Sequence, residues 1–179
     1  MHVNKTQVLC MDIHNFFPSI NINQVFEAFH CVGYTSDVAQ ALAQLCTHNA
    51  ILPQGAPTSP TLANIIFSPI DQQILNAIST KEITYTRYAD DLIFSSSHEL
   101  DFLIPLVSEI ISTNGFEINS NKTHLMKNPY RKMITGLIVT DTVKIPKYYK
   151  RKFNQELFYC EKYGLSLIHI SEPTRRTPI

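Results

Sequence analysis

The sequence predicts an α+β fold: an antiparallel sheet with helices on one face, in the split βαβ plan of ferredoxin-like and RNA-recognition-motif (RRM) domains. Three observations predict it. Strand-like and helix-like segments follow the order β-α-α-α-β-β-α-β, with a hairpin and a helix after them. The 179 residues are 44% apolar, enough for one domain with a hydrophobic core. No apolar run reaches the ~18 residues of a membrane span, so no membrane segment is expected.

The first third of the chain is expected to hold one strand and two helices. "TQVLCMDI" (6–13) is strand-like and contains Asp12 near its end. "NINQVFEAFHCVG" is typical of a short helix that Gly33 ends. "TSDVAQALAQLCTHN" predicts a second helix with Ser36 as its N-cap, and a turn-rich loop, "ILPQGAPTSP" (51–60), follows it.

The middle of the chain predicts a long helix and a hairpin. The helix covers about 60–79, with Ser59 as N-cap and Pro60 at the first helical position. Pro69 lies inside this helix and should kink it or split it in two. "EITYTRYADDLIFSS" (82–96) predicts two short strands around "ADD".

The last third predicts a helix, a strand, a hairpin and a basic helix. "ELDFLIPLVSEIISTNG" is amphipathic and ends at Gly115, and "FEINSNKTHLM" (116–126) predicts a strand followed by a polar loop. "RKMITGLIVTDTVKIP" predicts a hairpin, and "KYYKRKFNQELFYCEKYG" a basic amphipathic helix that Gly164 closes. The final "SLIHISEPTRRTPI" (166–179) has no period and resembles translated sequencing-adapter sequence, so we expect a non-native or disordered tail.

Charge and cysteine content narrow the class of protein. The first 121 residues hold 3 basic and 11 acidic side chains, whereas the remaining 58 hold 12 and 4. An acidic half suited to cations therefore precedes a basic half suited to phosphates. The four cysteines form no CxxC pair, which argues against a structural zinc or a disulfide framework and favours a cytoplasmic protein.

Asp90 and Asp91 stand side by side within an apolar run, where two like charges repel and resist desolvation. Adjacent carboxylates at a hairpin tip are commonly only turn residues. They can also both stay ionised around a divalent cation, and a third carboxylate on a neighbouring strand would complete a two-metal site. Asp12, at the end of the first strand, is the candidate for that third group.

Three motifs in a fixed order carry a family resemblance: "MDIHNFF" (11–17), "LPQGAPTSP" (52–60) and "YADD" (88–91). Together with "GFEINSNKT" (115–123) and "TGLIVTDTVKIPKYYKRKF" (135–153), they resemble the palm motifs of the reverse transcriptase family, most closely the bacterial retron-type enzymes. The resemblance implies a polymerase palm at residues 1–145 and a basic helix that starts the thumb connection at 146–165. It also implies RNA-directed DNA polymerase activity, with RNA template, DNA or RNA primer and dNTP as partners.

The resemblance also implies site residues. Two Mg²⁺ ions, with Mn²⁺ as an alternative, would be held by Asp12, Asp90, Asp91 and the Ile13 carbonyl. The dNTP would meet backbone N–H groups of Asn15 and Phe16, a steric gate at Phe17 that excludes a 2′-OH, and a pocket formed by Gln54 and Gly55. Primer and template would contact Tyr88, Gly136, Leu137, Lys147 and Arg151. Lys122 would protonate the leaving pyrophosphate as general acid, although an ordinary surface lysine is a competing interpretation.

The sequence also departs from the family. Only about five residues precede the first palm strand, so the fingers are expected to be missing and the thumb largely missing, with weak or no activity for this chain alone. Two alternatives remain open: a non-catalytic RNA-binding module built on the RRM-like palm, and, less favoured, a nucleotidyl cyclase. A cognate structured noncoding RNA is a further expected partner of a retron-type enzyme.

Overall fold

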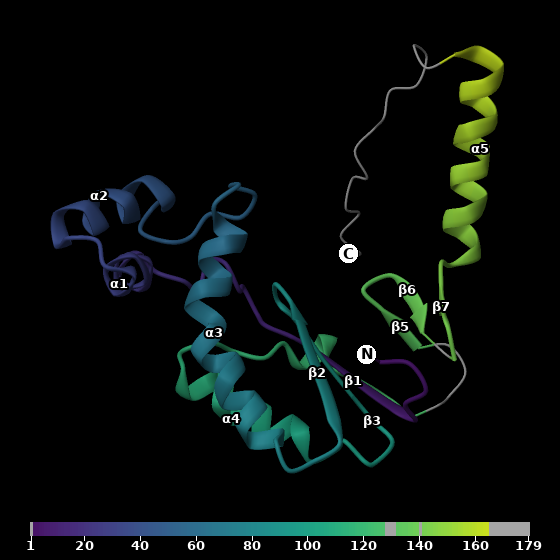
Figure 1. Ribbon diagram of the computed structural model, residues 1–179, viewed down its shortest axis with the longest axis horizontal. Helices are drawn as coiled ribbons and strands as arrows, with labels where there is room; N and C mark the ends of the chain where they lie inside the picture. Colours follow the sequence, from purple (N-terminus) through teal and green to yellow (C-terminus); the bar gives the residue numbers. More distant parts are fainter. Residues whose placement is uncertain (1, 128–131, 140, 165–179) are drawn as a thin grey trace.

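The computed structural model describes residues 2–127, 132–139 and 141–164. The predicted tail at 166–179 lies outside the described residues. Within the described part, an antiparallel sheet and a set of helices form the body of the molecule, and one further helix projects from it (Figure 1). The predicted mixture of helices and antiparallel strands is therefore confirmed.

The main sheet has four antiparallel strands in the order β2-β3-β1-β4. Its strands are β1 (Gln7–Asp12), β2 (Ile83–Tyr88), β3 (Asp91–Ser96) and β4 (His124–Met126). β2 and β3 form the predicted hairpin, and β1 pairs with β3 over its whole length. The first strand of the chain therefore lies in the interior of the sheet, between two strands that come later in the sequence.

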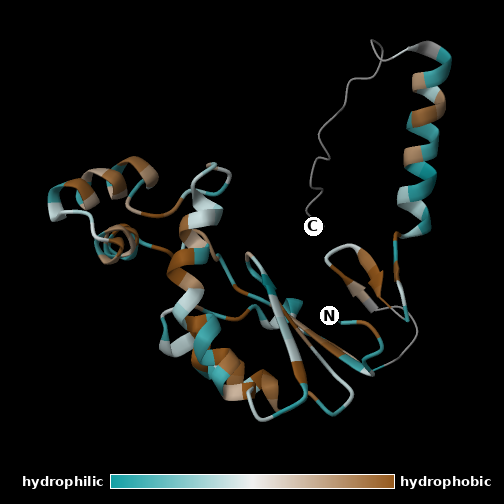
Figure 2. Cartoon of the chain, in the orientation of Figure 1, coloured by the Kyte–Doolittle hydropathy of each residue, from teal (hydrophilic) through white to brown (hydrophobic). Residues whose placement is uncertain are grey.

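Two helices cover one face of this sheet: α3 (Ser59–Ile78) and α4 (Leu103–Thr113) (Figure 1). Alternation along β1 explains why, because Leu9, Met11 and Ile13 all point into the core shared with these helices. The brown apolar residues of Figure 2 mark this core on α3, α4 and the strands. The buried helix residues are Leu62, Ala63, Phe67, Ile70, Ile74, Ile78, Leu103, Val107 and Ile111.

A pair of helices, α1 (Ile22–Val32) and α2 (Ser36–Cys46), packs beside α3. Asn21 caps α1 with a capping box completed by Gln24, and Gly33 ends the helix with a φ of +111°. A left-handed backbone of this kind is one that glycine adopts without strain. Both predicted helices are confirmed, but Ser36 is the first residue of α2 and not its predicted N-cap, which is Thr35.

A small second sheet lies on the face opposite to α3 and α4. It consists of β5 (Lys132–Ile134), β6 (Leu137–Val139) and β7 (Val143–Lys144), joined in that order. Ile134 and Val139 pack on Val8 and Ile93 of the main sheet, which fixes this hairpin beside the open face. The basic helix α5 (Lys147–Tyr163) follows and stands away from the sheet (Figure 1).

The helix around Pro69 and the segment 116–126 also differ from what the sequence predicts. α3 is one continuous helix across Pro69, and the buried Phe67, Ile70 and Ile74 offset the backbone hydrogen bond that proline removes. The predicted strand at the start of 116–126 is reduced to an isolated antiparallel bridge between Ile118 and Ile13. The Asn119 side chain accepts from the Asn121 N–H and starts a 3₁₀ turn, η1 (Ser120–Lys122), so that β4 begins only at His124.

No helix within the described ranges is both long and apolar enough to cross a membrane.

Candidate active site

Strand register places two of the predicted metal ligands, Asp12 and Asp91, side by side. Asp12, the last residue of β1, lies directly opposite Asp91, the first residue of β3. Directly opposite residues share a face, with Cβ atoms about 4.5–5.5 Å apart. Asp12 shares its face with Val8 and Cys10, so both carboxyl groups lie on the face opposite to α3 and α4.

Asp90 is held by the backbone rather than by its side chain. It forms the two-residue turn between β2 and β3 together with Ala89, whose φ is +51°. Its carbonyl oxygen accepts a 2.9 Å hydrogen bond from the Ile13 N–H, directly after β1. This bond ties the hairpin tip to the end of the central strand, so that Asp90 stays beside Asp12.

Lys122 reaches the same place from η1. Its Nζ donates to Asp12 Oδ2 over 3.0 Å, although 61% of the lysine side chain is exposed to solvent. The hydrogen bond to Asp12 is the largest influence that raises the Lys122 pKa above its ordinary value, and the charges of Asp12, Asp90 and Asp91 add to it. The ammonium group is therefore protonated at neutral pH and contacts Asp12 directly.

The side chains do not form a ready-made metal cluster: among the described residues, no group of three or more His, Cys, Asp or Glu side chains is arranged to hold an ion. Asp12 is instead turned to Lys122. The donor set nevertheless fits a hard divalent cation, because the three acids supply only carboxylate oxygens and two of them line an open cavity.

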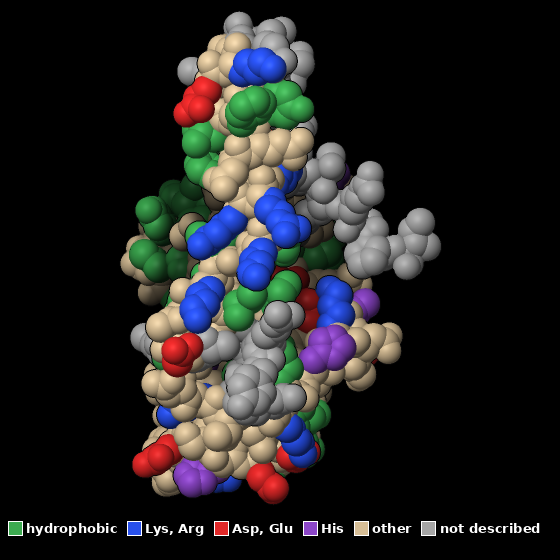
Figure 3. Space-filling view, turned by 90° about the vertical axis from the view of Figure 1, so that its right-hand side faces the viewer, with side chains coloured by type: hydrophobic (Ala, Val, Ile, Leu, Met, Phe, Trp, Pro, Cys, Tyr) green, Lys and Arg blue, Asp and Glu red, His purple; other side chains and the backbone are tan. Residues whose placement is uncertain are grey.

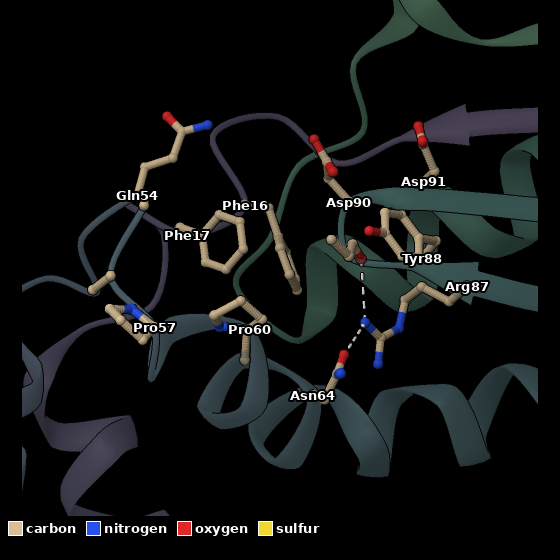
Figure 4. A pocket seen from close by; sticks show the side chains of 14 residues that line it. Phe16, Phe17, Gln54, Pro57, Pro60, Asn64, Arg87, Tyr88, Asp90 and Asp91 are labelled. Atoms are coloured by element: carbon tan, nitrogen blue, oxygen red, sulfur yellow. Dashed lines mark hydrogen bonds between the residues drawn. The ribbon is translucent and has the colours of Figure 1, made fainter. Parts of the chain in front are cut away.

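A cavity of about 600 Å³ begins at Asp90 and Asp91 and extends to the loop before α3 (Figure 4). In Figure 4 the two acids project from the hairpin on one side, and Gln54 extends from the loop on the other. Phe16 and Phe17 lie between them. The cavity therefore joins the carboxylates to the predicted nucleotide residues.

The two neighbouring phenylalanines have different environments. Phe16 is buried in the core and contacts Phe67 edge to face, with ring centroids 5.5 Å apart. Phe17 is only partly buried and rests on Phe16 at 5.3 Å, so its outer face is available to the cavity. The preceding Asn15 has a φ of +47° and its carbonyl accepts from the Ser19 N–H and hydroxyl; its side chain does not line the cavity.

The loop on the far side is fixed at its base. Ser59, fully buried at the start of α3, donates a 2.6 Å hydrogen bond to the Pro53 carbonyl. Gly55, next to the exposed Gln54, has a φ of +93°. The loop conformation therefore requires glycine at this position. Ser59 is the first residue of α3 and not its predicted N-cap, which is Thr58.

A second hollow of about 310 Å³ lies against Asp12 and Asp91 and is also lined by Cys10, Lys122 and His124. Burial, and then the charge of Asp91, raises the pKa of the Cys10 thiol to about 11. This thiol is therefore neutral at physiological pH and behaves as a small apolar side chain.

The predicted nucleic-acid residues lie at increasing distance from the acids. Tyr88 pairs with Asp91 across the hairpin and is 71% exposed. Gly136 and Leu137 lie at the turn and start of β6, and Gly136 has a φ of +82°. Lys147 and Arg151 are on α5, where Figure 3 shows Lys and Arg side chains in succession along the helix. The structure thus brings Asp90 and Asp91 to one cavity with the predicted nucleotide residues, whereas Lys147 and Arg151 lie apart on α5.

Sequence patterns do not identify the role of Arg87. The side chain is only 8% exposed and pairs with Asp71 of α3 over 2.7 Å. It also donates to the Asn64 side chain and to the Ala89 carbonyl (Figure 4). Its partners are distant in the chain, so no local pattern could have indicated them.

Comparison with known proteins agrees with this geometry. A family model described as "Reverse transcriptase (RNA-dependent DNA polymerase)" matches residues 2–151. The chain belongs to the reverse transcriptase family. This reverse transcriptase chain is 37% identical over 145 residues to "Retron Ec86 reverse transcriptase" of Escherichia coli, covering 78% of this chain and 44% of that protein. It is 30% identical to "Retron Se72 reverse transcriptase" of Salmonella heidelberg, covering 96% and 48% respectively.

These relatives confirm the predicted resemblance to retron-type reverse transcriptases. The chain spans less than half the length of either one. Among solved structures, an apo telomerase of Candida tropicalis truncated from its C-terminal domain shares the fold with a TM-score of 0.59 and 16% sequence identity. That likeness covers 78% of this chain and 35% of the telomerase chain.

Proposed function

We propose that this chain is the catalytic palm of an RNA-directed DNA polymerase, which adds dNTPs to the 3′-OH of a primer on an RNA template. The observation that carries the proposal is the register of β1 and β3, which sets Asp12 opposite Asp91, and Asp91 lines a nucleotide-sized cavity together with Asp90. Family membership supports the reaction class.

Divalent ions would be held by Asp12, Asp90 and Asp91, with the Ile13 carbonyl as a further ligand. Two Mg²⁺ ions, or Mn²⁺ in their place, would supply Lewis-acid stabilisation of the attacking and leaving oxygens in an in-line phosphoryl displacement. The residues themselves concentrate negative charge at one point of an otherwise apolar hairpin, which attracts cations. Lys122 would have to release Asp12 for this carboxylate to serve as a ligand.

The opposite wall of the cavity would receive the nucleotide. Phe17 presents a flat ring to the cavity and would exclude a ribose 2′-OH, while backbone N–H groups of Asn15 and Phe16 would meet the triphosphate. Gln54 and Gly55 would line the base pocket, where a glycine allows close approach of the backbone. Ser59 would keep this loop in place through Pro53.

Lys122 would act beside the leaving pyrophosphate. Its pKa is raised by Asp12, so the group stays protonated at the pH of the reaction. Once Asp12 binds a cation, the ammonium is free to donate a proton or a charge-assisted hydrogen bond to the leaving group.

Primer and template would follow the open face of the sheet. Tyr88 lies in one row with Asp91 and Asp12 and would contact the primer end. Gly136 and Leu137, on the hairpin that packs on the same face, would grip the primer, and Lys147 and Arg151 would contact the backbone of the duplex. A cognate structured noncoding RNA is a further partner that we propose from the retron-type relatives.

The chain alone is expected to bind nucleotide weakly. Among the residues that line the main cavity, Arg87 is the only cationic side chain, and its guanidinium is already paired with Asp71. A triphosphate would therefore meet little positive charge apart from its own metal ions. We propose that fingers and thumb segments supply the missing grip in the longer relatives.

Two measurements on this chain test the proposal. The first is Mn²⁺ binding, followed by the loss of the free-ion EPR signal, for wild type, Asp12→Asn and Asp90→Asn. The second is incorporation of one labelled dNTP onto a primer annealed to RNA, with protein in excess over primer. We expect each substitution to weaken Mn²⁺ binding at least tenfold, and Asp90→Asn to abolish any slow incorporation.

Equal Mn²⁺ affinity in all three proteins would overturn the proposal. If RNA binding then persisted without Mg²⁺ and without dependence on Asp12, the chain would instead be a non-catalytic RNA-binding module. A Lys81→Gln variant serves as the control, because Lys81 lies over the Phe102 ring, at the end of α3 remote from the cavity.

A further inference from the structure

The Arg87 guanidinium joins α3 to the turn that carries the acids. Nε and Nη2 donate to both oxygens of Asp71, at 3.0, 3.1 and 2.7 Å. Nη1 donates to Asn64 Oδ1 at 2.9 Å and to the Ala89 carbonyl at 3.2 Å. One planar group therefore connects two positions of a long helix with the residue immediately before Asp90.

The turn that it holds is strained. Ala89 has a φ of +51°, in the left-handed region that residues with a Cβ rarely adopt. Such a backbone persists only when the surrounding structure fixes it, and it occurs preferentially at functional sites. The hydrogen bond from Arg87 to the Ala89 carbonyl, and the bond from Ile13 to the Asp90 carbonyl, are the described contacts that fix it.

The same guanidinium also contacts the nucleotide side of the cavity. Its central carbon lies 4.6 Å from the Phe67 ring centroid and 6.0 Å from that of Phe16. Phe16 in turn supports Phe17 at 5.3 Å. Cation–π contacts of this kind are strengthened when the cation is desolvated, as the largely buried Arg87 is.

We propose that Arg87 is a positioning residue, which holds the Ala89–Asp90 turn in the conformation that presents Asp90 and Asp91 for metal binding. The inference rests on the proposed metal site and goes beyond it, because Arg87 would act on the acids through the Ala89 carbonyl and not as a metal ligand. It acts through one peptide group, anchored to Asp71 and Asn64 on α3. The anchoring helix begins at Ser59, so α3 fixes both walls of the cavity.

Geometry predicts that lysine cannot replace this arginine. The ammonium group of a lysine side chain at this position could keep the ion pair with Asp71, but it donates all of its hydrogen bonds from one nitrogen atom. It could not reach two carboxylate oxygens, the Asn64 amide and the Ala89 carbonyl together, as the planar fork does. Arg87→Lys therefore keeps the positive charge that pairs with Asp71 and preserves the fold. It removes the planar guanidinium that positions the turn.

The test compares Mn²⁺ affinity with stability in a set of variants of this chain. Affinity is measured by EPR, stability by thermal unfolding in EDTA, and turn mobility by amide hydrogen exchange of residues 89–92. We expect Arg87→Lys to bind Mn²⁺ at least fivefold more weakly and to exchange faster at the turn. Asn64→Ala removes an exposed anchor without touching the ion pair, and we expect a twofold to fivefold loss of affinity.

Tyr85→Phe is the matched control. The Tyr85 hydroxyl donates to Asp71 Oδ1 at 2.6 Å. The substitution therefore removes one hydrogen bond to the carboxylate that anchors Arg87, and it leaves the Arg87 contact with Ala89 in place. We expect a lower melting temperature with unchanged Mn²⁺ affinity. This result separates a positioning role from a general loss of stability.

The outcomes distinguish this inference from the proposed function. If Asp90→Asn binds Mn²⁺ as wild type does, the metal site itself is wrong. If Asp90→Asn loses affinity while Arg87→Lys and Asn64→Ala retain it, the site stands and the positioning role of Arg87 is overturned. If Arg87→Lys does not fold, the Mn²⁺ affinity of Asn64→Ala alone decides the question. This variant is expected to fold, because position 64 is exposed and alanine is favourable in a helix.

Discussion

At the scale of single residues, the fold holds carboxylates of like charge close together at the site. Asp12 and Asp91 face each other across two strands, where like charges destabilise a sheet. Lys122 relieves part of that repulsion through Asp12. The repulsion lowers the stability of the protein when no cation is bound. A cation bound between the carboxylates would remove the repulsion and stabilise the folded state.

Asp91→Asn should therefore stabilise the protein in EDTA and remove its response to metal. The substitution removes the repulsion with Asp12, so we expect an unchanged or higher free energy of unfolding, by up to about 1 kcal/mol. Millimolar Mg²⁺ should raise the melting temperature of wild type and not that of the variant. Thermal unfolding with and without Mg²⁺ checks this, and a Mg²⁺-induced rise in the variant equal to that of wild type would contradict it.

Tyr85 gives the fold a dependence on alkaline pH. Burial, followed by its hydrogen bond to Asp71, raises the pKa of Tyr85 above its ordinary value of 10.0. A raised pKa in the folded state means that the neutral phenol stabilises the fold below about pH 10, and that this contribution is lost as pH rises further. Urea unfolding at pH 8, 9.5 and 11 should show wild type losing about 1–2 kcal/mol more than Tyr85→Phe over that range.

At the scale of elements, α3 organises the cavity. Its first residue fixes the loop with Gln54 and Gly55, and its middle residues anchor Arg87 beneath the hairpin. The helix buries seven residues along one face, so both contacts are attached to a rigid body. The two walls of the cavity are therefore positioned by one element rather than by two loops.

Ser59→Ala should loosen one wall and leave the other intact. The Ser59 hydroxyl is buried, and its loss leaves the Pro53 carbonyl without that donor, which costs about 1–2 kcal/mol. We expect faster hydrogen exchange in residues 54–58, unchanged exchange in 89–92 and unchanged Mn²⁺ affinity. An equal loss of hydrogen-exchange protection in residues 54–58 and 89–92 would show that the two walls of the cavity are not independent.

The sequence predicts those elements whose pattern is local. The hairpin around Asp90 follows from its flanking strand residues, and the end of α1 from Gly33, and both are confirmed. The strand expected at 116 is limited to one bridge at Ile118, because the Asn119 side chain redirects the backbone into η1. The convergence of Asp12 with Asp91 needed the family motifs, and the role of Arg87 needed coordinates, because its partners are fixed by tertiary packing alone.

At the scale of the whole molecule, charge is divided between two parts. Asp12 and Asp91 lie in the sheet with Asp90 next to them, whereas Lys147, Lys150, Arg151 and Lys152 lie on α5, a helix that stands apart from it (Figure 1). Exposed Tyr148 and Tyr149 lie among those charges, with ring centroids 4.4 Å apart. This combination favours binding to a nucleic-acid backbone with little sequence preference.

A Lys150→Gln/Arg151→Gln double variant should weaken RNA binding without affecting the metal site. We expect the slope of log affinity against log salt to fall by about one to two, because each lost phosphate contact removes roughly one unit. Fluorescence anisotropy with a labelled RNA hairpin over a range of KCl concentrations measures the slope. Lys81→Gln/Lys127→Gln removes the same charge elsewhere, and an equal effect of this control would contradict a specific role for α5.

The central position of β1 has a consequence for biosynthesis. Its hydrogen-bonding partners β3 and β4 are translated well after it, so the nascent strand "VLCM" emerges with both edges unpaired. Until the ribosome has passed residue 96, these apolar residues have no sheet to join, and slow non-local pairing exposes such segments to aggregation. Chaperone occupancy during synthesis should accordingly be highest while translation runs between β1 and β3.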